Sequence, residues 1–238
     1  MKIINVECLI IDKLYPYVVI QTDDGITGFG ECFRRAPFIT KAAIETVYKD
    51  ILINLNPLEI SNIWNKLFNA SSVAGPYGSL LTAVSGIDTA LWDIKLKEKK
   101  ISLSEEFGGK KKNFIDLYAS SMRRDMEPME EAERAQYFYE MGFKYYKMHS
   151  AFPEEIDSPN DNTLKTVSAI RKLLGDNIEI MVDVNGAYSL NKALEVGKEL
   201  QNLDVFQFEQ PVHVTMLDEM KIIQEELEIN ISSGECCY

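Results

Sequence analysis

Three short runs rich in apolar and β-branched residues open the chain. They cover residues 3–11, 18–21 and 26–32, and Asp24-Gly25 stands between the second and the third. Asp-Gly between two apolar runs is typical of a tight hairpin turn in which both turn residues take positive φ. The pattern predicts an antiparallel meander of three strands.

Apolar positions then recur at helical spacing between residues 37 and 99. The stripe consists of Leu80, Ala83, Val84, Ile87, Ala90, Leu91 and Ile94. Spacings of three and four residues place these side chains on one face of a helix that packs on a core. Gly108-Gly109 ends the region, and a lysine triplet follows it as a solvated linker. We therefore place a first α+β domain at residues 1–112.

From residue 113 onward, short apolar runs alternate with amphipathic ones. The predicted strands are 114–120, 144–149, 178–184, 205–208 and 229–232, and the predicted helices are 128–141, 163–174, 190–200 and 216–227. Repeated β-α alternation indicates a parallel sheet with helices outside, either doubly wound or a barrel. Residues 113–238 form the second predicted domain.

Composition narrows the class of protein. The 238 residues carry 25 Lys+Arg against 37 Asp+Glu, a net charge of −12, which disfavours binding to nucleic acid. No apolar run approaches the roughly 20 residues of a membrane span, and no signal peptide opens the chain. The four cysteines, Cys8, Cys32, Cys236 and Cys237, form no C-x-x-C pair. We expect reduced thiols and a cytoplasmic protein without nucleic-acid or membrane partners.

Candidate chemistry lies at the ends of the predicted parallel strands, where reactive side chains of βα repeats are found. These positions are Lys147, His149, Asp183, Asn185, Glu209 and Glu235. Asp183, Glu209 and Glu235 follow one another at intervals of 26 residues, so we expect them at equivalent points of successive βα units. Their side chains should then converge on one mouth of the sheet.

Three converging carboxylates repel one another unless a cation lies among them. Ligands that are all oxygen favour Mg²⁺ or Mn²⁺ over zinc. The alternative is that each acid is a solvated loop residue, as most are. Apolar neighbours of Asp183 and Glu209 argue against it. Lys147 and His149 lie two residues apart on one strand and point the same way, as a base next to a bound carboxylate would.

Several motifs together resemble the enolase superfamily, in the branch of mandelate racemase and muconate lactonizing enzyme. They are residues 22–31 and 83–93 in the first domain and residues 182–186, 208–211 and 233–235 in the second. The resemblance implies an α+β capping domain followed by a (β/α) TIM-type barrel, of which this chain holds the first five strands. A complete barrel takes about 250 residues by itself, so we read the chain as C-terminally incomplete.

The resemblance also implies roles for individual residues. Asp183, Glu209 and Glu235 would bind Mg²⁺, or Mn²⁺, with Asn185 beside the metal and the substrate. The second-strand motif of the family is commonly Lys-x-Lys; Lys147 matches its first lysine and His149 replaces the second.

The first barrel loop resembles that of some acid-sugar dehydratases. Ser120 and Arg124, or Arg123, would contact the substrate there. A loop at residues 14–17 would close over the substrate.

The expected function is Mg²⁺-dependent abstraction of the proton α to a carboxylate, in an acid-sugar dehydratase that is a homo-oligomer when full length. Alternatives within the family are a racemase or epimerase and a muconate-type cycloisomerase. A third alternative is an inactive fragment that lacks the base on the opposite face of the substrate. In every active case the partner is a small carboxylate, most simply a sugar acid.

Overall fold

The computed structural model describes residues 1–75 and 77–235, which form two compact units. The first is Met1–Asn113 and the second begins at Phe114. Each unit has its own hydrophobic core. The prediction of reduced thiols at Cys236 and Cys237 lies outside the described residues.

The first unit holds an antiparallel sheet in the order β1 (Ile3–Ile11), β2 (Tyr15–Thr22) and β3 (Thr27–Glu31). The predicted meander is confirmed, but the hairpin turn differs. Four residues connect β2 to β3, and of the Asp-Gly pair Gly25 alone takes positive φ, at 81°. A four-residue connection is most often built around a type I turn, which does not require positive φ at two adjacent residues. Residues 15–17, expected in a loop, belong to β2, where they pair with β1.

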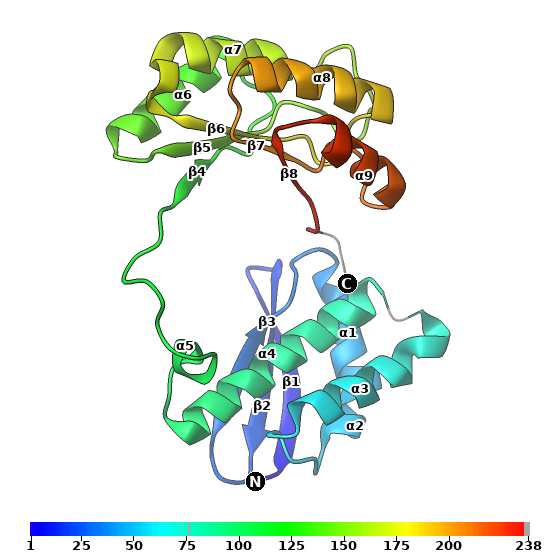
Figure 1. The fold of residues 1–238 in the computed structure, drawn as a ribbon. Coiled ribbons are helices and arrows are strands. Elements are labelled where there is room, and N and C mark those ends of the chain that lie inside the picture. Colours follow the sequence, from blue (N-terminus) through cyan, green and yellow to red (C-terminus); the bar gives the residue numbers. More distant parts are fainter. Residues whose placement is uncertain (76, 236–238) are drawn as a thin grey trace. The chain divides into compact units, whose positions relative to one another are not determined.

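Helices pack on one face of this sheet (Figure 1). They are α1 (Pro37–Ala43), the π-helix η1 (Ile44–Tyr48), α2 (Lys49–Leu52), α3 (Ile60–Ser71), the 3₁₀ turn η2 (Ser72–Ala74), α4 (Ser79–Lys99) and α5 (Leu103–Glu106). The predicted stripe of α4 is buried, with Leu80 at its margin. Glycines allow α4 to approach β3 closely, since a Cβ on Gly30 would lie 1.9 Å from the carbonyl oxygen of Gly86.

The second unit holds a parallel sheet in the order β4 (Tyr118–Ser120), β5 (Tyr145–Met148), β6 (Glu179–Asp183), β7 (Gln207–Glu209) and β8 (Asn230–Ser232). The helices between the strands are α6 (Pro128–Glu140), α7 (Thr163–Leu174) with the 3₁₀ turn η3 (Gly175–Asn177), α8 (Leu190–Asn202) and α9 (Leu217–Glu226). Helices α6, α7 and α8 lie along one face of the sheet (Figure 1). This confirms an α+β unit followed by five strands of a (β/α) barrel.

The first strand of this sheet is much shorter than predicted. We expected residues 114–120, but β4 pairs with β5 from Tyr118 onward. Phe114, Ile115 and Leu117 are 70–83% exposed. Apolar character alone does not make a strand where no neighbouring backbone pairs with it.

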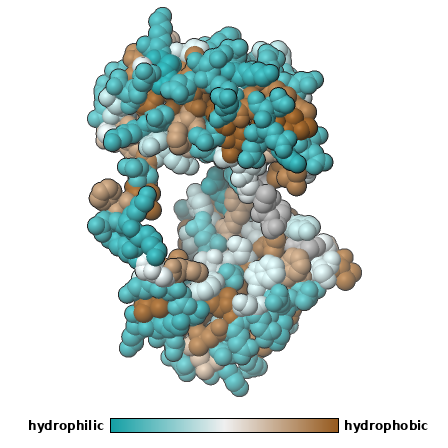
Figure 2. Space-filling view, in the orientation of Figure 1, coloured by the Kyte–Doolittle hydropathy of each residue, from teal (hydrophilic) through white to brown (hydrophobic). Residues whose placement is uncertain are grey.

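On the face shown in Figure 2, hydrophilic residues cover much of each unit. Within the described ranges, no helix is both long enough and apolar enough to cross a membrane. Cys8 and Cys32 are free and buried, as expected, and burial raises the pKa of the Cys32 thiol to about 12.

Candidate active site at the strand ends

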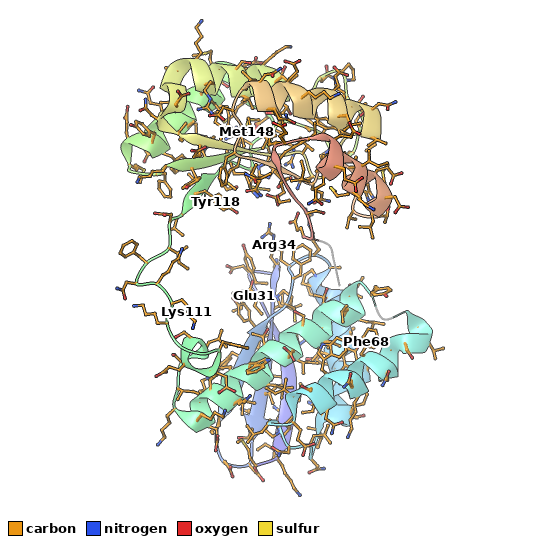
Figure 3. All side chains as sticks on the ribbon, in the orientation of Figure 1. Glu31, Arg34, Phe68, Lys111, Tyr118 and Met148 are labelled. Carbon is orange, nitrogen blue, oxygen red and sulfur yellow. The ribbon has the colours of Figure 1, made fainter. Side chains whose placement is uncertain are left out.

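Four of the predicted residues meet at the carboxyl ends of β5, β6 and β7. The Nζ of Lys147 lies 2.9 Å from Oε2 of Glu209 and 3.4 Å from Oδ2 of Asp183. The Nε2 of His149 lies 3.1 Å from the same Oδ2 of Asp183. Figure 3 labels Met148, which stands between Lys147 and His149 on the chain. The sheet register causes this meeting, because Asp183 and Glu209 are direct partners on adjacent strands.

The cluster is largely withdrawn from solvent. The side chains of His149 and Asp183 are 1% and 3% exposed, and those of Lys147 and Glu209 are 11% and 20% exposed. Burial by itself raises the pKa of Asp183. The hydrogen bonds from His149 and the Asn185 N–H, with the charges of His149 and Lys147, outweigh burial and hold the pKa of Asp183 below its ordinary value.

Lys147 shows the complementary effect. Burial alone lowers the pKa of its ammonium group, but the hydrogen bond to Glu209 and the charges of Glu209 and Asp183 raise the pKa above its ordinary value. The cluster therefore holds an ammonium group between two carboxylates.

The ring of His149 is fixed at both nitrogens. Its Nδ1 lies 2.5 Å from the carbonyl oxygen of Ser121. A carbonyl oxygen can only accept, so Nδ1 carries a hydrogen. At the other nitrogen, Nε2 and the Asp183 carboxylate need one more proton between them to form their hydrogen bond. This arrangement suits a group that takes up and returns a proton at Nε2.

Ser121 was not predicted. We expected Ser120, which lies exposed at the end of β4 and is the register partner of Lys147. Ser121 contributes a backbone carbonyl, and side-chain chemistry in the sequence gives no signal for such a contact.

Arg124 connects the loops that follow the strands. Its Nε donates to the carbonyl oxygen of Ala151 at 2.8 Å, and its Nη2 donates to Oδ1 of Asn185. The N–H of Asn185 in turn donates to Oδ1 of Asp183 at 2.9 Å. Arg123 is paired with Asp125 in solvent at 2.6 Å. Arg124 thus lies next to the cluster, and contacts of Ser120, Arg124 and Asn185 with a substrate stay predictions.

Glu235 lies apart from the other acids. Glu209 pairs in register with Ser232, so Glu235 stands three residues beyond the level of the other two carboxylates, in an exposed turn. The three acids are equally spaced along the chain but do not lie at the same level of the sheet, because β8 ends at Ser232. Within residues 1–75 and 77–235, no group of three or more His, Cys, Asp or Glu side chains is close enough to hold a metal ion.

The remaining donors nevertheless suit a hard cation in kind. Asp183 and Glu209 offer carboxylate oxygens on adjacent strands, and no thiol lies with them in the cluster. Such donors match Mg²⁺ or Mn²⁺. Two of the three predicted ligands therefore come together.

Strained backbone surrounds the same edge of the sheet. Asn185 and Gln210 take φ of 47° and 45°. The N–H of Gly186 donates to the carbonyl oxygen of Gln210 at 2.7 Å. The N–H of Gln210 donates to the carbonyl oxygen of Ser232 at 2.8 Å. Non-glycine residues with positive φ cluster at functional sites. Gln210 was not predicted, since a residue before proline normally prefers an extended conformation.

Two family models match most of the chain. The N-terminal domain of the mandelate racemase / muconate lactonizing enzyme family matches residues 11–108, and the enolase C-terminal domain-like model matches residues 130–238. The first range falls in the first unit, and the described residues of the second range, 130–235, fall in the second unit.

Two individual relatives agree with these family models. Arabinonate dehydratase of Saccharolobus solfataricus is 31% identical over 223 residues, which cover 92% of this chain and 58% of that protein. D-galactarolactone cycloisomerase of Agrobacterium fabrum is 33% identical over 230 residues, with 94% and 58% covered. The chain thus spans 58% of the length of these curated relatives.

A solved structure confirms the fold. A mandelate racemase/muconate lactonizing protein from Paracoccus denitrificans, crystallised with magnesium, matches with a TM-score of 0.90 at 24% identity, over 100% of this chain and 66% of that one. The sequence motifs, the two domain models and the shared fold lead to one conclusion. The chain belongs to the mandelate racemase and muconate lactonizing enzyme branch of the enolase superfamily.

Proposed function

We propose that the edge of the sheet formed by β5, β6 and β7 abstracts the proton α to the carboxylate of a sugar acid, with the help of Mg²⁺ or Mn²⁺. The observation that carries this proposal is the cluster of Lys147, His149, Asp183 and Glu209. It combines a cation, a proton-transferring ring and two carboxylates in one largely buried place.

Asp183 and Glu209 would hold the divalent cation, and by the family resemblance Glu235 would be the third ligand. When bound there, such a cation would supply positive charge that offsets the charge developing on the substrate carboxylate. The Lys147 ammonium group donates hydrogen bonds to that carboxylate.

His149 is the proposed proton carrier. Its Nε2 accepts the α proton while the Ser121 carbonyl keeps the ring in place through Nδ1–H. In a dehydration, the imidazolium returns this proton to the β-hydroxyl as the carbon–oxygen bond breaks. One water leaves, and the enol product tautomerises to a 2-keto-3-deoxy acid, so the reaction balances without another reactant.

Dehydration is the first candidate because of the similarity to arabinonate dehydratase. Cycloisomerisation is the second, because the similarity to D-galactarolactone cycloisomerase is of the same order. Both reactions can start from the same α-proton abstraction. They differ in their products, since cycloisomerisation retains the mass of the substrate.

Incubation in D₂O with Mg²⁺ tests the proposal. Arabinonate and galactarolactone are each mixed with the chain and followed by mass spectrometry and proton NMR. We expect exchange of the α proton for deuterium, or loss of one water, with the wild type and with a Glu199→Gln control on the exposed face of α8. His149→Ala should abolish both. Turnover that survives in His149→Ala would overturn its role, and no exchange with either acid would overturn the substrate class.

A further inference from the structure

A buried polar group lies on the opposite face of β5 from the proposed site. Glu131 of α6 is 2% exposed and Tyr146 of β5 is completely buried. The Tyr146 hydroxyl donates to Oε1 of Glu131 at 2.7 Å. Tyr146 is the neighbour of Lys147 on the strand, so their side chains leave the sheet on opposite faces.

Further polar atoms gather around this hydroxyl. The Ser121 hydroxyl, Oε2 of Glu131 and Nε of Arg134 are buried without a hydrogen-bond partner among the described residues. Burial, followed by the hydrogen bond and charge of Glu131, raises the pKa of Tyr146; the Ser121 hydroxyl and the Arg134 charge oppose this rise. Ala119 is the register partner of Tyr146, and Ser121 lies two residues beyond Ala119, so the Ser121 side chain leaves the sheet on the same face as Tyr146.

Stability alone does not account for such a group. A buried carboxylate with one neutral donor is costly, and an apolar residue of similar size at position 131 would pack without that cost. The polar group therefore calls for a role beyond holding α6 on the sheet.

Ser121 connects the group to the site. Its side chain is completely buried. Its N–H donates to the Lys147 carbonyl at 2.8 Å, and its own carbonyl accepts from Nδ1 of His149. A change in the orientation of the Ser121 peptide would therefore move the partner that fixes the imidazole ring.

We propose that Glu131, Tyr146 and Ser121 form a positioning relay that runs from α6 through the sheet and holds the His149 ring in its orientation. Glu131 holds the Tyr146 hydroxyl, the Tyr146 side chain packs on the same face of the sheet as the buried Ser121 side chain, and the Ser121 carbonyl holds His149. The relay rests on the proposed role of His149, but its geometry can be tested without substrate or metal.

The Nδ1–H proton of His149 gives a direct readout by NMR of the ¹⁵N-labelled chain. The chain has two histidines, and His213 is exposed, so His213→Gln assigns the signals. In the wild type we expect a downfield, slowly exchanging Nδ1–H signal. Tyr146→Phe and Glu131→Leu should shift it upfield and speed its exchange with water. Glu131→Gln should keep it near the wild-type position, because an amide oxygen still accepts from Tyr146.

Two variants separate positioning from loss of stability. Tyr188→Phe removes another buried hydroxyl of the same unit, which bonds to Asp161 and Thr163, and should leave the His149 signal unchanged. Ser121→Ala removes one atom, keeps the carbonyl and serves if Tyr146→Phe does not fold; it should shift the signal. An unshifted signal in the folded relay variants, or an equal shift in Tyr188→Phe, would overturn the relay.

The outcome is independent of the proposed function. If the His149 signal responds as expected but no sugar acid reacts, the relay stands and the function fails. If sugar acids react but the signal ignores all relay variants, the function stands and the relay fails.

Discussion

Lys147 carries the charge balance of the site, because its ammonium group contacts both Asp183 and Glu209. Replacing it by methionine keeps the volume and leaves two adjacent carboxylates without their cation. We expect Lys147→Met to lower the free energy of unfolding of the second unit by about 2–3 kcal/mol, less than for a fully buried pair because Glu209 is partly solvated.

Urea unfolding followed by far-UV circular dichroism measures this loss. Lys165→Met, at an exposed lysine of α7 that contacts Asn162, is the control and should change stability by no more than about 0.5 kcal/mol. Equal stability of Lys147→Met and wild type would show that the ammonium group does not balance the acids.

Asp183 makes stability depend on pH in a defined direction. Its pKa in the folded chain lies below the ordinary value of 3.8. Its contribution is therefore complete above that value and is lost as the pH falls through the folded pKa. Lys147, whose pKa is raised above 10.5, contributes in the opposite sense and loses its effect at alkaline pH.

Urea midpoints measured between pH of about 7 and 2.5 test this loss of stability at acid pH. Asp183→Asn should be less stable than wild type at neutral pH and should lose less stability on acidification. If both proteins lose the same stability on acidification, other carboxylates cause the loss.

At the residue scale, the sequence predicted which residues form the candidate site better than it predicted their contacts. Strand-end positions led to Lys147, His149, Asp183 and Glu209, because alternation and βα order determine which side chains share an edge. The Ser121 carbonyl and the positive φ of Gln210 were missed, since backbone groups and local strain leave no mark in residue type.

Among the elements, the contact between β3 and α4 depends on the absence of side chains. A Cβ on Gly30 would meet backbone atoms, at 1.9 Å from the Gly86 oxygen and 2.8 Å from the Ala90 nitrogen. Because backbone atoms cannot move away as a flexible side chain can, we expect Gly30→Ala to destabilise the first unit by about 3 kcal/mol.

Tryptophan fluorescence measures this effect, since Trp64 and Trp92 both lie in the first unit. Gly197→Ala is a useful comparison, because its Cβ would meet the Leu227 side chain, which can move; its change, followed by circular dichroism, should stay within about 1 kcal/mol. A Gly30→Ala variant as stable as wild type would mean that α4 shifts without cost.

Long amphipathic helices were predicted well, whereas a very short helix and the start of one strand were not. The helix at residues 163–174 was predicted with its observed ends. Helix α5 was missed although Ser102 and Glu105 form a capping box that the sequence displays. The prediction of β4 was too long, because pairing with β5 rather than apolar character sets its start.

For the whole molecule, two units reflect the change of pattern seen along the chain. Antiparallel strands with helices precede Asn113, and βα repeats follow it. Periodicity indicates such a division because it depends on many residues at once. The position of Glu235 relative to Asp183 and Glu209 depends on where one strand ends, and equal spacing of the acids along the chain does not determine it.

Isothermal titration with Mg²⁺ tests the central claim, that the acids at the ends of β6 and β7 hold a divalent cation. We predict that the wild type and the Glu199→Gln control bind Mg²⁺ equally, whereas Asp183→Asn and Glu209→Gln each weaken binding at least about tenfold, or about 1.4 kcal/mol. Binding unchanged in both site variants, or no binding by the wild type, would contradict the account.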